Sequence, residues 1–194
     1  MVVPGPGQML VLARTASDGQ TQGIATSLGL ELGTLGHTVA ATVGLSALLA
    51  TSSLAFAVVK YLGAIYLVYL GIRAFRTRPT SRVPDGNTVA NRHSFIRCVI
   101  QAMATGLLNP KVAIFFLAFL PQFVHPLRGH VALQFLILGL TLASIGFAFD
   151  SALAITVAHL GRSLLEKPAF LRWRQRVAGA VLVGLGTKLA FSQR

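Results

Sequence analysis

The chain has 194 residues, of which 54% are hydrophobic and only 11% charged, and its formal net charge is +12. Soluble domains carry about 25% charged residues, so this composition excludes an ordinary water-soluble globular domain. The basic residues fall between long apolar stretches, which is typical of the loops of membrane proteins and argues against nucleic-acid binding. The single cysteine, Cys98, excludes an intrachain disulfide or a cysteine-based zinc cluster.

Long apolar stretches predict an all-α, polytopic membrane bundle of about six transmembrane helices. A spanning helix needs about 20 mostly apolar residues, and four segments reach that length, at about 24–50, 54–75, 95–120 and 131–158. A further segment at about 177–191 is short but workable if Arg176 and Lys188 extend to the two membrane surfaces. The segment at about 2–13 is too short to span, so we expect a truncated first helix: either about ten apolar residues are encoded upstream of Met1, or half of the helix has been lost.

The polar segments between the apolar stretches predict the topology. The positive-inside rule places the basic segments 76–93 and 162–176, and the turn from Arg14 to Gly23, in the cytoplasm. The turn at Ser52 and Ser53 then lies outside, as do both termini. Residues 1–194 thus form one membrane domain of two inverted halves of three helices, at about 1–76 and 95–192, with a cytoplasmic linker at about 77–94.

The first helix of each half contains a proline break. One consists of Pro4, Gly5, Pro6 and Gly7, and the other of Asn109, Pro110 and Lys111. Proline removes a backbone donor and clashes with the preceding turn, and Asn followed by Pro suits an N-cap and a first helical residue. Each break would therefore expose a half-helix N-terminus inside the bilayer, with unpaired N–H groups that attract a carboxylate. Paired breaks in inverted repeats indicate a transporter site, although proline can also merely kink a membrane helix.

Ionisable residues inside the apolar segments are the second group of candidates. Glu31 and Asp150 lie at similar depth in the inner half of the membrane, in the second and fifth helices. A charge at that depth costs about 2.5 kcal/mol or more unless it is paired or hydrated. These acids therefore either face a substrate ammonium group or carry a proton, or else they pair structurally with a lysine. His37, in mid-helix, is either a proton shuttle or a packing histidine.

Small residues recur on one face of the second helix, at Gly29, Gly33, Gly36, Ala40 and Gly44. A face of this kind permits close helix packing. The sequence leaves open whether it forms an internal seam or the contact of a homodimer.

In this order, the motifs resemble the lysine exporter (LysE/RhtB) family of amino-acid efflux proteins. The resemblance covers about residues 4–160 and rests on Pro4-Gly5-Pro6, the glycine-rich second helix with His37, Lys60-Tyr61-Leu62-Gly63, Asn109-Pro110-Lys111 and Phe119-Leu120-Pro121-Gln122-Phe123. Asp150 falls where related proteins often have an acid, whereas Glu31 stands where many relatives are expected to have a small or apolar residue. The resemblance implies proton-driven export of amino acids or their derivatives across the bacterial inner membrane, with no cofactor.

Two other classes of function have weaker support. A membrane hydrolase would need a motif such as His-Glu-x-x-His or Gly-x-Ser-x-Gly, and the sequence contains neither, nor a phosphate-binding loop, so we expect no enzyme. A metal-ion or other small-cation exporter of related architecture is the main alternative. Its linker would be expected to be rich in histidine or acids, whereas residues 76–93 contain only His93 and Asp85.

The predicted site combines these groups. We expect the substrate carboxylate at the two half-helix ends, Pro4 to Gly7 and Asn109 to Lys111, and its ammonium group near Asp150 and Glu31. Asp150, Glu31 and His37 are the candidates for proton coupling, and no catalytic or metal-binding residue is expected. The predicted partners are the amino-acid substrate, protons and membrane lipid.

Overall fold

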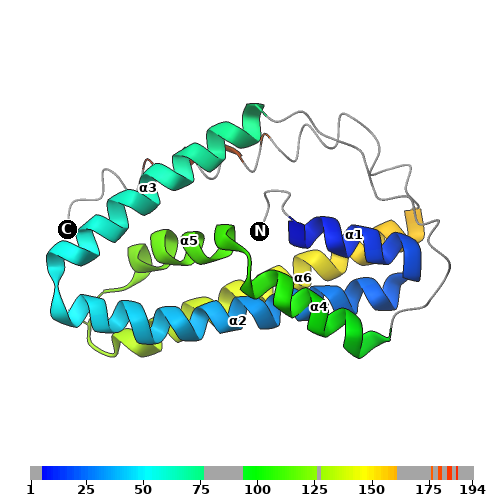
Figure 1. Ribbon diagram of the computed structural model, residues 1–194, viewed down its shortest axis with the longest axis horizontal. Helices are drawn as coiled ribbons and strands as arrows, with labels where there is room; N and C mark the ends of the chain where they lie inside the picture. The colour runs from blue at the N-terminus through cyan, green and yellow to red at the C-terminus, as the bar shows by residue number, and fades with distance from the viewer. Residues whose placement is uncertain are drawn as a thin grey trace.

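Helices make up the described part of the chain in the computed structural model (Figure 1), and no β-strand occurs among those residues. The structure describes residues 6–76, 94–125 and 128–160, with the isolated positions 176, 179, 180, 183, 184 and 187. The elements in chain order are α1 (Pro6–Asp18), α2 (Gln20–Thr51), α3 (Ser53–Arg76), α4 (Phe95–Leu107), α5 (Pro110–Phe119), the 3-10 helix η1 (Leu120–Phe123) and α6 (Val131–Leu160). The predicted all-α helical bundle is confirmed.

The helix boundaries agree closely with the predicted apolar segments, with one difference at the first turn. The predicted turn from Arg14 to Gly23 is too long, because α1 continues to Asp18 and α2 already begins at Gln20. Gly19 alone connects them with a φ of 101°, a left-handed conformation that glycine adopts without steric cost. The polar residues of this stretch are compatible with a helix, so a prediction from polarity alone made the turn too long.

One described helix, α6, is by length and composition able to cross a membrane over Val131–His159, with a mean hydropathy of 2.1. The pair Phe95–Leu107 and Pro110–Phe123 passes the same test as one broken span, bent by 54°. Within α3 the apolar stretch that qualifies is shorter, Tyr61–Arg73. The predicted last helix, at 177–191, lies largely outside the described residues.

The long helix α2 is the centre of the bundle, where it packs against α1, α4, α5 and α6. Figure 1 shows α2 and α6 running side by side along the long axis, with α4 crossing α2. One apolar cluster joins α2 to α5, η1 and α6 through Leu45, Phe116 and Phe135. A second joins α1, α2, α4 and α6 through the buried residues Val11, Leu30, Ala102 and Ala154. Each half of α2 thus has its own core, and the break between α4 and α5 lies between them.

The glycine-rich face of α2 is an internal seam with α4. A Cβ atom added at Gly29 would lie 2.7 Å from Cβ of Ala102, and one at Gly33 would lie 3.0 Å from Cα of Gly106. Real Cβ atoms essentially never approach other atoms more closely than 3.0 Å, so no larger residue fits this seam without moving the helices apart. Gly44 differs from these glycines, because no atom of the described residues lies within 4 Å of an added Cβ there.

Candidate functional site

The break between α4 and α5 has the local chemistry that the sequence predicts. Asn109 has an extended backbone, with φ −82° and ψ 104°, and its side chain accepts a hydrogen bond from Lys111 N–H. The distance from Lys111 N to Asn109 Oδ1 is 3.1 Å, and Pro110 is the first residue of α5. The predicted N-cap is confirmed, and with it a half-helix that begins at Pro110.

The N–H groups at this helix end are not unpaired, contrary to expectation. Pro110 has none, Lys111 N–H donates to the Asn109 side chain, and Val112 N–H donates to Asn109 O at 3.0 Å. Asn109 thus accepts hydrogen bonds from the first N–H groups of α5 through both its side chain and its backbone carbonyl group. The partial positive charge of this helix end favours an anion, and the half-buried Lys111 side chain lies in the same turn.

The same proline leaves a carbonyl group at the end of α4. In a continuous helix Gly106 C=O would accept from the N–H of residue 110, but Pro110 has no N–H. His37 Nε2 lies 3.2 Å from Gly106 O, and Asn109 N–H donates to the same oxygen, also at 3.2 Å. Since a carbonyl oxygen only accepts, His37 donates from Nε2. His37, a candidate for proton coupling, is therefore hydrogen-bonded directly to the helix break.

The first turn of α1 contacts both α2 and α6. Pro4 and Gly5 lie outside the described residues, and α1 begins at Pro6, as predicted. Gly7 is buried where a Cβ would lie 2.9 Å from the Leu30 side chain. Gln8, buried one position later, donates from Nε2 to Asp150 Oδ1 at 3.3 Å. The start of α1 is thereby held against both α2 and α6.

Asp150 and Glu31 are 5% and 6% exposed, and their carboxyl groups interact electrostatically. Among the described residues no hydrogen-bond donor reaches Glu31 Oε2, and no ion pair with a lysine involves Glu31. The described contacts thus give no support to a structural lysine partner for Glu31. Gln8, Glu31 and Asp150, from three different helices, form a buried polar cluster beside the first turn of α1.

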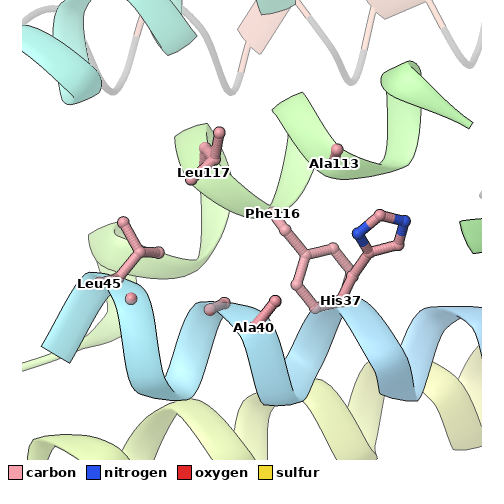
Figure 2. Close-up of a pocket in the computed structure, with 8 residues that line it drawn as sticks. His37, Ala40, Leu45, Ala113, Phe116 and Leu117 are labelled. Carbon is pink, nitrogen blue, oxygen red and sulfur yellow. The ribbon is translucent and has the colours of Figure 1, made fainter. Parts of the chain in front are cut away.

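Sequence reasoning missed two parts of this arrangement. The first is Gln8, although a polar side chain directly after Pro-Gly-Pro-Gly in an apolar segment is a usable signal. The second is an apolar groove between α2 and α5, of about 330 Å³ (Figure 2). Its lining residues are His37, Ala40, Ala41, Gly44, Leu45, Ala113, Phe116 and Leu117. No sequence signal marks the groove, because it depends on how two helices meet.

In Figure 1 the first turns of α1 and α5 lie near the centre of the view, and the two helices run from there in opposite directions. Among the described residues, no group of three or more His, Cys, Asp or Glu side chains is placed to hold a metal ion. The described geometry therefore centres on two helix starts, a buried acid pair and an adjoining apolar groove.

Known proteins with similar sequences indicate the family to which this chain belongs. The leucine efflux protein of Klebsiella pneumoniae is 30% identical over 100% of this chain and 90% of its own length. The homoserine/homoserine lactone efflux protein of Salmonella typhimurium is 31% identical over 96% of this chain and 88% of its own length. A protein of Vibrio cholerae described as an uncharacterized membrane protein is 32% identical over 97% of this chain and 90% of its own length. No solved structure matches significantly.

The family comparison covers nearly the whole chain, since residues 1–193 match the model of the LysE type translocator. This match agrees with the efflux activities named for two of the relatives and does not favour a metal exporter. The chain belongs to the LysE type translocator family.

Proposed function

We propose that the protein is a multi-pass secondary transporter that exports amino acids or their derivatives across the bacterial inner membrane in exchange for protons. Family membership and relatives named as leucine and homoserine efflux proteins support an amino-acid exporter. The proton coupling rests on the buried polar cluster of Gln8, Glu31 and Asp150.

The observation that carries the proposal is the burial of two acids, Glu31 and Asp150, with no salt bridge from Glu31 to a lysine or arginine among the described residues. A lone charge within the membrane costs about 2.5 kcal/mol or more, so Glu31 needs either a proton or a cationic ligand. A substrate ammonium group supplies both the positive charge and the N–H donors that Glu31 Oε2 lacks among the described residues. A proton neutralises the same carboxyl group. Competition between the two is the exchange that a proton-driven exporter requires.

In this proposal the substrate carboxylate lies toward the two helix starts. Lys111 contributes an ammonium group at the start of α5, and the helix ends at Pro4 to Gly7 and at Asn109 to Lys111 contribute partial positive charge. Because Asn109 already occupies the Lys111 N–H group, the carboxylate either displaces the Asn109 side chain or binds outside it. His37 holds the end of α4 in place through Gly106 O, so it acts on the geometry of the break.

The test is Asp150→Asn in purified protein reconstituted into liposomes with an imposed pH gradient. This substitution keeps the size and hydrogen-bonding capacity of the side chain but removes its charge. We expect normal folding and loss of gradient-driven amino-acid efflux. The matched control is Asp18→Asn, the same change at a side chain that pairs with Arg14 at 3.1 Å at the end of α1, where transport should persist.

Wild-type transport rates in Asp150→Asn would disprove its role in coupling. If Asp150→Asn does not fold, Glu31→Gln distinguishes a coupling role of the acids from a structural role. No described donor binds Glu31 Oε2, so the variant with a neutral side chain should fold. Folded Glu31→Gln protein with unchanged proton-driven efflux would leave the acids as structural groups.

A further inference from the structure

Gln8 begins the buried stripe of α1. The stripe continues with Val11, Leu12 and Thr15, at the three- and four-residue spacing of one helix face, and all four side chains are at most 6% exposed. Thr15 satisfies its hydroxyl group within α1, by donating to Val11 O at 2.8 Å. Gln8 instead donates across the bundle, from Nε2 to Asp150 Oδ1 of α6 at 3.3 Å. A buried amide is costly unless it is hydrogen-bonded, and an aliphatic residue would suit this stripe equally well, so packing alone does not explain Gln8.

The amide of Gln8 responds to the charge of Asp150 without titrating itself. An amide N–H donates at every pH, and its bond to a carboxylate is about twice as strong as its bond to a neutral acid. The bond therefore favours the carboxylate form of Asp150 over the protonated form. Because the donor lies on α1 and the acceptor on α6, a proton on Asp150 also weakens this contact between the two helices.

The other ionisable groups around Asp150 come from several helices. α6 itself and the helices α1 and α2 packed against it carry Arg14, Asp18, Glu31, His37 and His159. α4 and α5, which meet α6 in the two apolar clusters, carry Arg97, Cys98 and Lys111. Arg14 and Asp18 form an ion pair near the end of α1, whereas Glu31 interacts electrostatically with Asp150. The negative charge of Glu31 favours a protonated Asp150, and the bond from Gln8 opposes that effect.

We propose that Gln8 is a positioning residue for Asp150, whose carboxyl group it orients and keeps in the charged form that binds a substrate ammonium group. The inference rests on the proposed proton-driven export, and it assigns to Gln8 the task of setting the pH at which protons displace the amino acid. Without the amide, Asp150 takes up a proton at higher pH, and the amino acid loses the competition sooner. An amide that only fills space between α1 and α6 is the opposing outcome of the test.

The experiment measures amino-acid exchange by wild type and Gln8→Met in proteoliposomes, with equal pH on both faces, from mildly acidic to mildly alkaline pH. Methionine matches glutamine in length but has no N–H donor. The probe is radiolabelled leucine, replaced by the best-transported amino acid of a standard panel if leucine is not exchanged. We expect Gln8→Met to raise KM at acidic pH about fivefold, equivalent to about 1 kcal/mol, the difference between hydrogen bonds to charged and to neutral groups. The rise should fade as the pH increases, and kcat should change less than KM.

The matched control is Gln134→Met, the same change at a glutamine remote from the acids. Gln134 Nε2 donates to His125 O at 3.1 Å and to Gly129 O at 2.7 Å, in the loop before α6. This variant also loses hydrogen bonds between a side chain and its surroundings, so it reports a general loss of stability. Its ratio of KM to that of wild type should be the same at every pH.

Failure of the inference and failure of the proposed function give different results. If wild type exchanges no amino acid of the panel, or its KM does not depend on pH, the proposed function fails and the role of Gln8 with it. If the KM of wild type depends on pH but Gln8→Met raises it equally at every pH or not at all, Gln8 only packs, and the proposed export stands. If Gln8→Met does not fold, Gln8→Asn withdraws the same amide from Asp150 by one methylene group and must raise KM selectively at acidic pH.

Discussion

Replacing Gly29 with alanine tests the close contact between α2 and α4. Gly29 lies in the seam between α2 and α4, where a Cβ would meet the carbonyl oxygen of Val99 and would lie 2.7 Å from the Ala102 Cβ. One of these neighbours is backbone and the other is a side chain without a rotatable bond between heavy atoms. Neither can turn away, so the helices themselves must separate.

The magnitude follows from two opposing effects. Overpacking costs about 1–3 kcal/mol, and contact with rigid atoms justifies the upper value. Alanine regains about 1 kcal/mol of helix propensity over glycine, which leaves a net loss of about 2 kcal/mol. For a chain of 150–250 residues this corresponds to a Tm lower by about 4–8 °C. In Gly44→Ala only the propensity gain acts, so its Tm should rise by about 2–4 °C.

The assay is thermal unfolding of wild type, Gly29→Ala and Gly44→Ala, purified in one detergent and followed by loss of the monodisperse peak in size-exclusion chromatography. The two variants make the same chemical change on the same helix, so their opposite signs isolate the contact with α4. A Tm of Gly29→Ala equal to or above that of wild type would refute the packing of α2 against α4.

Two further predictions concern the break and the topology. Asn109→Ala removes the side chain that caps Lys111 N–H, and it should destabilise the protein by about 1 kcal/mol in the same melting assay, whereas Asn109→Asp retains the cap and should melt near wild type. Equal melting of both variants and wild type would show that the cap does not stabilise α5. Ser81→Cys, in a Cys98→Ala background, should resist a membrane-impermeant thiol reagent in intact cells, because the basic linker at 77–94 is predicted to be cytoplasmic. Labelling from outside would reverse the topology.

The sequence predicts the features of this chain that depend on neighbouring residues. The long apolar stretches predict helices because backbone N–H and C=O groups in lipid must be satisfied within the same segment. The predicted fifth helix, 131–158, corresponds to α6 and ends only two residues before the observed end at Leu160. The break at Asn109 and Pro110 is equally local, since the missing N–H and the capping side chain are properties of two adjacent residues. The predicted turn wrongly extended to Gly23 because the residues before it are polar. Polarity does not by itself end a helix, and α2 already begins at Gln20.

Only the tertiary structure decides which of these local features meet. Gln8 and Asp150 are 142 positions apart, and their hydrogen bond exists because α1 and α6 pack against each other as well as against α2. The glycine face of α2 had two possible partners, and its internal contact with Gly106 and Ala102 could not be inferred from α2 alone. The bond from His37 to Gly106 O and the groove beside Gly44 likewise require the relative placement of two helices. Helix packing depends on the complementary shapes of several surfaces at once, whereas the helices form from the composition of each segment by itself.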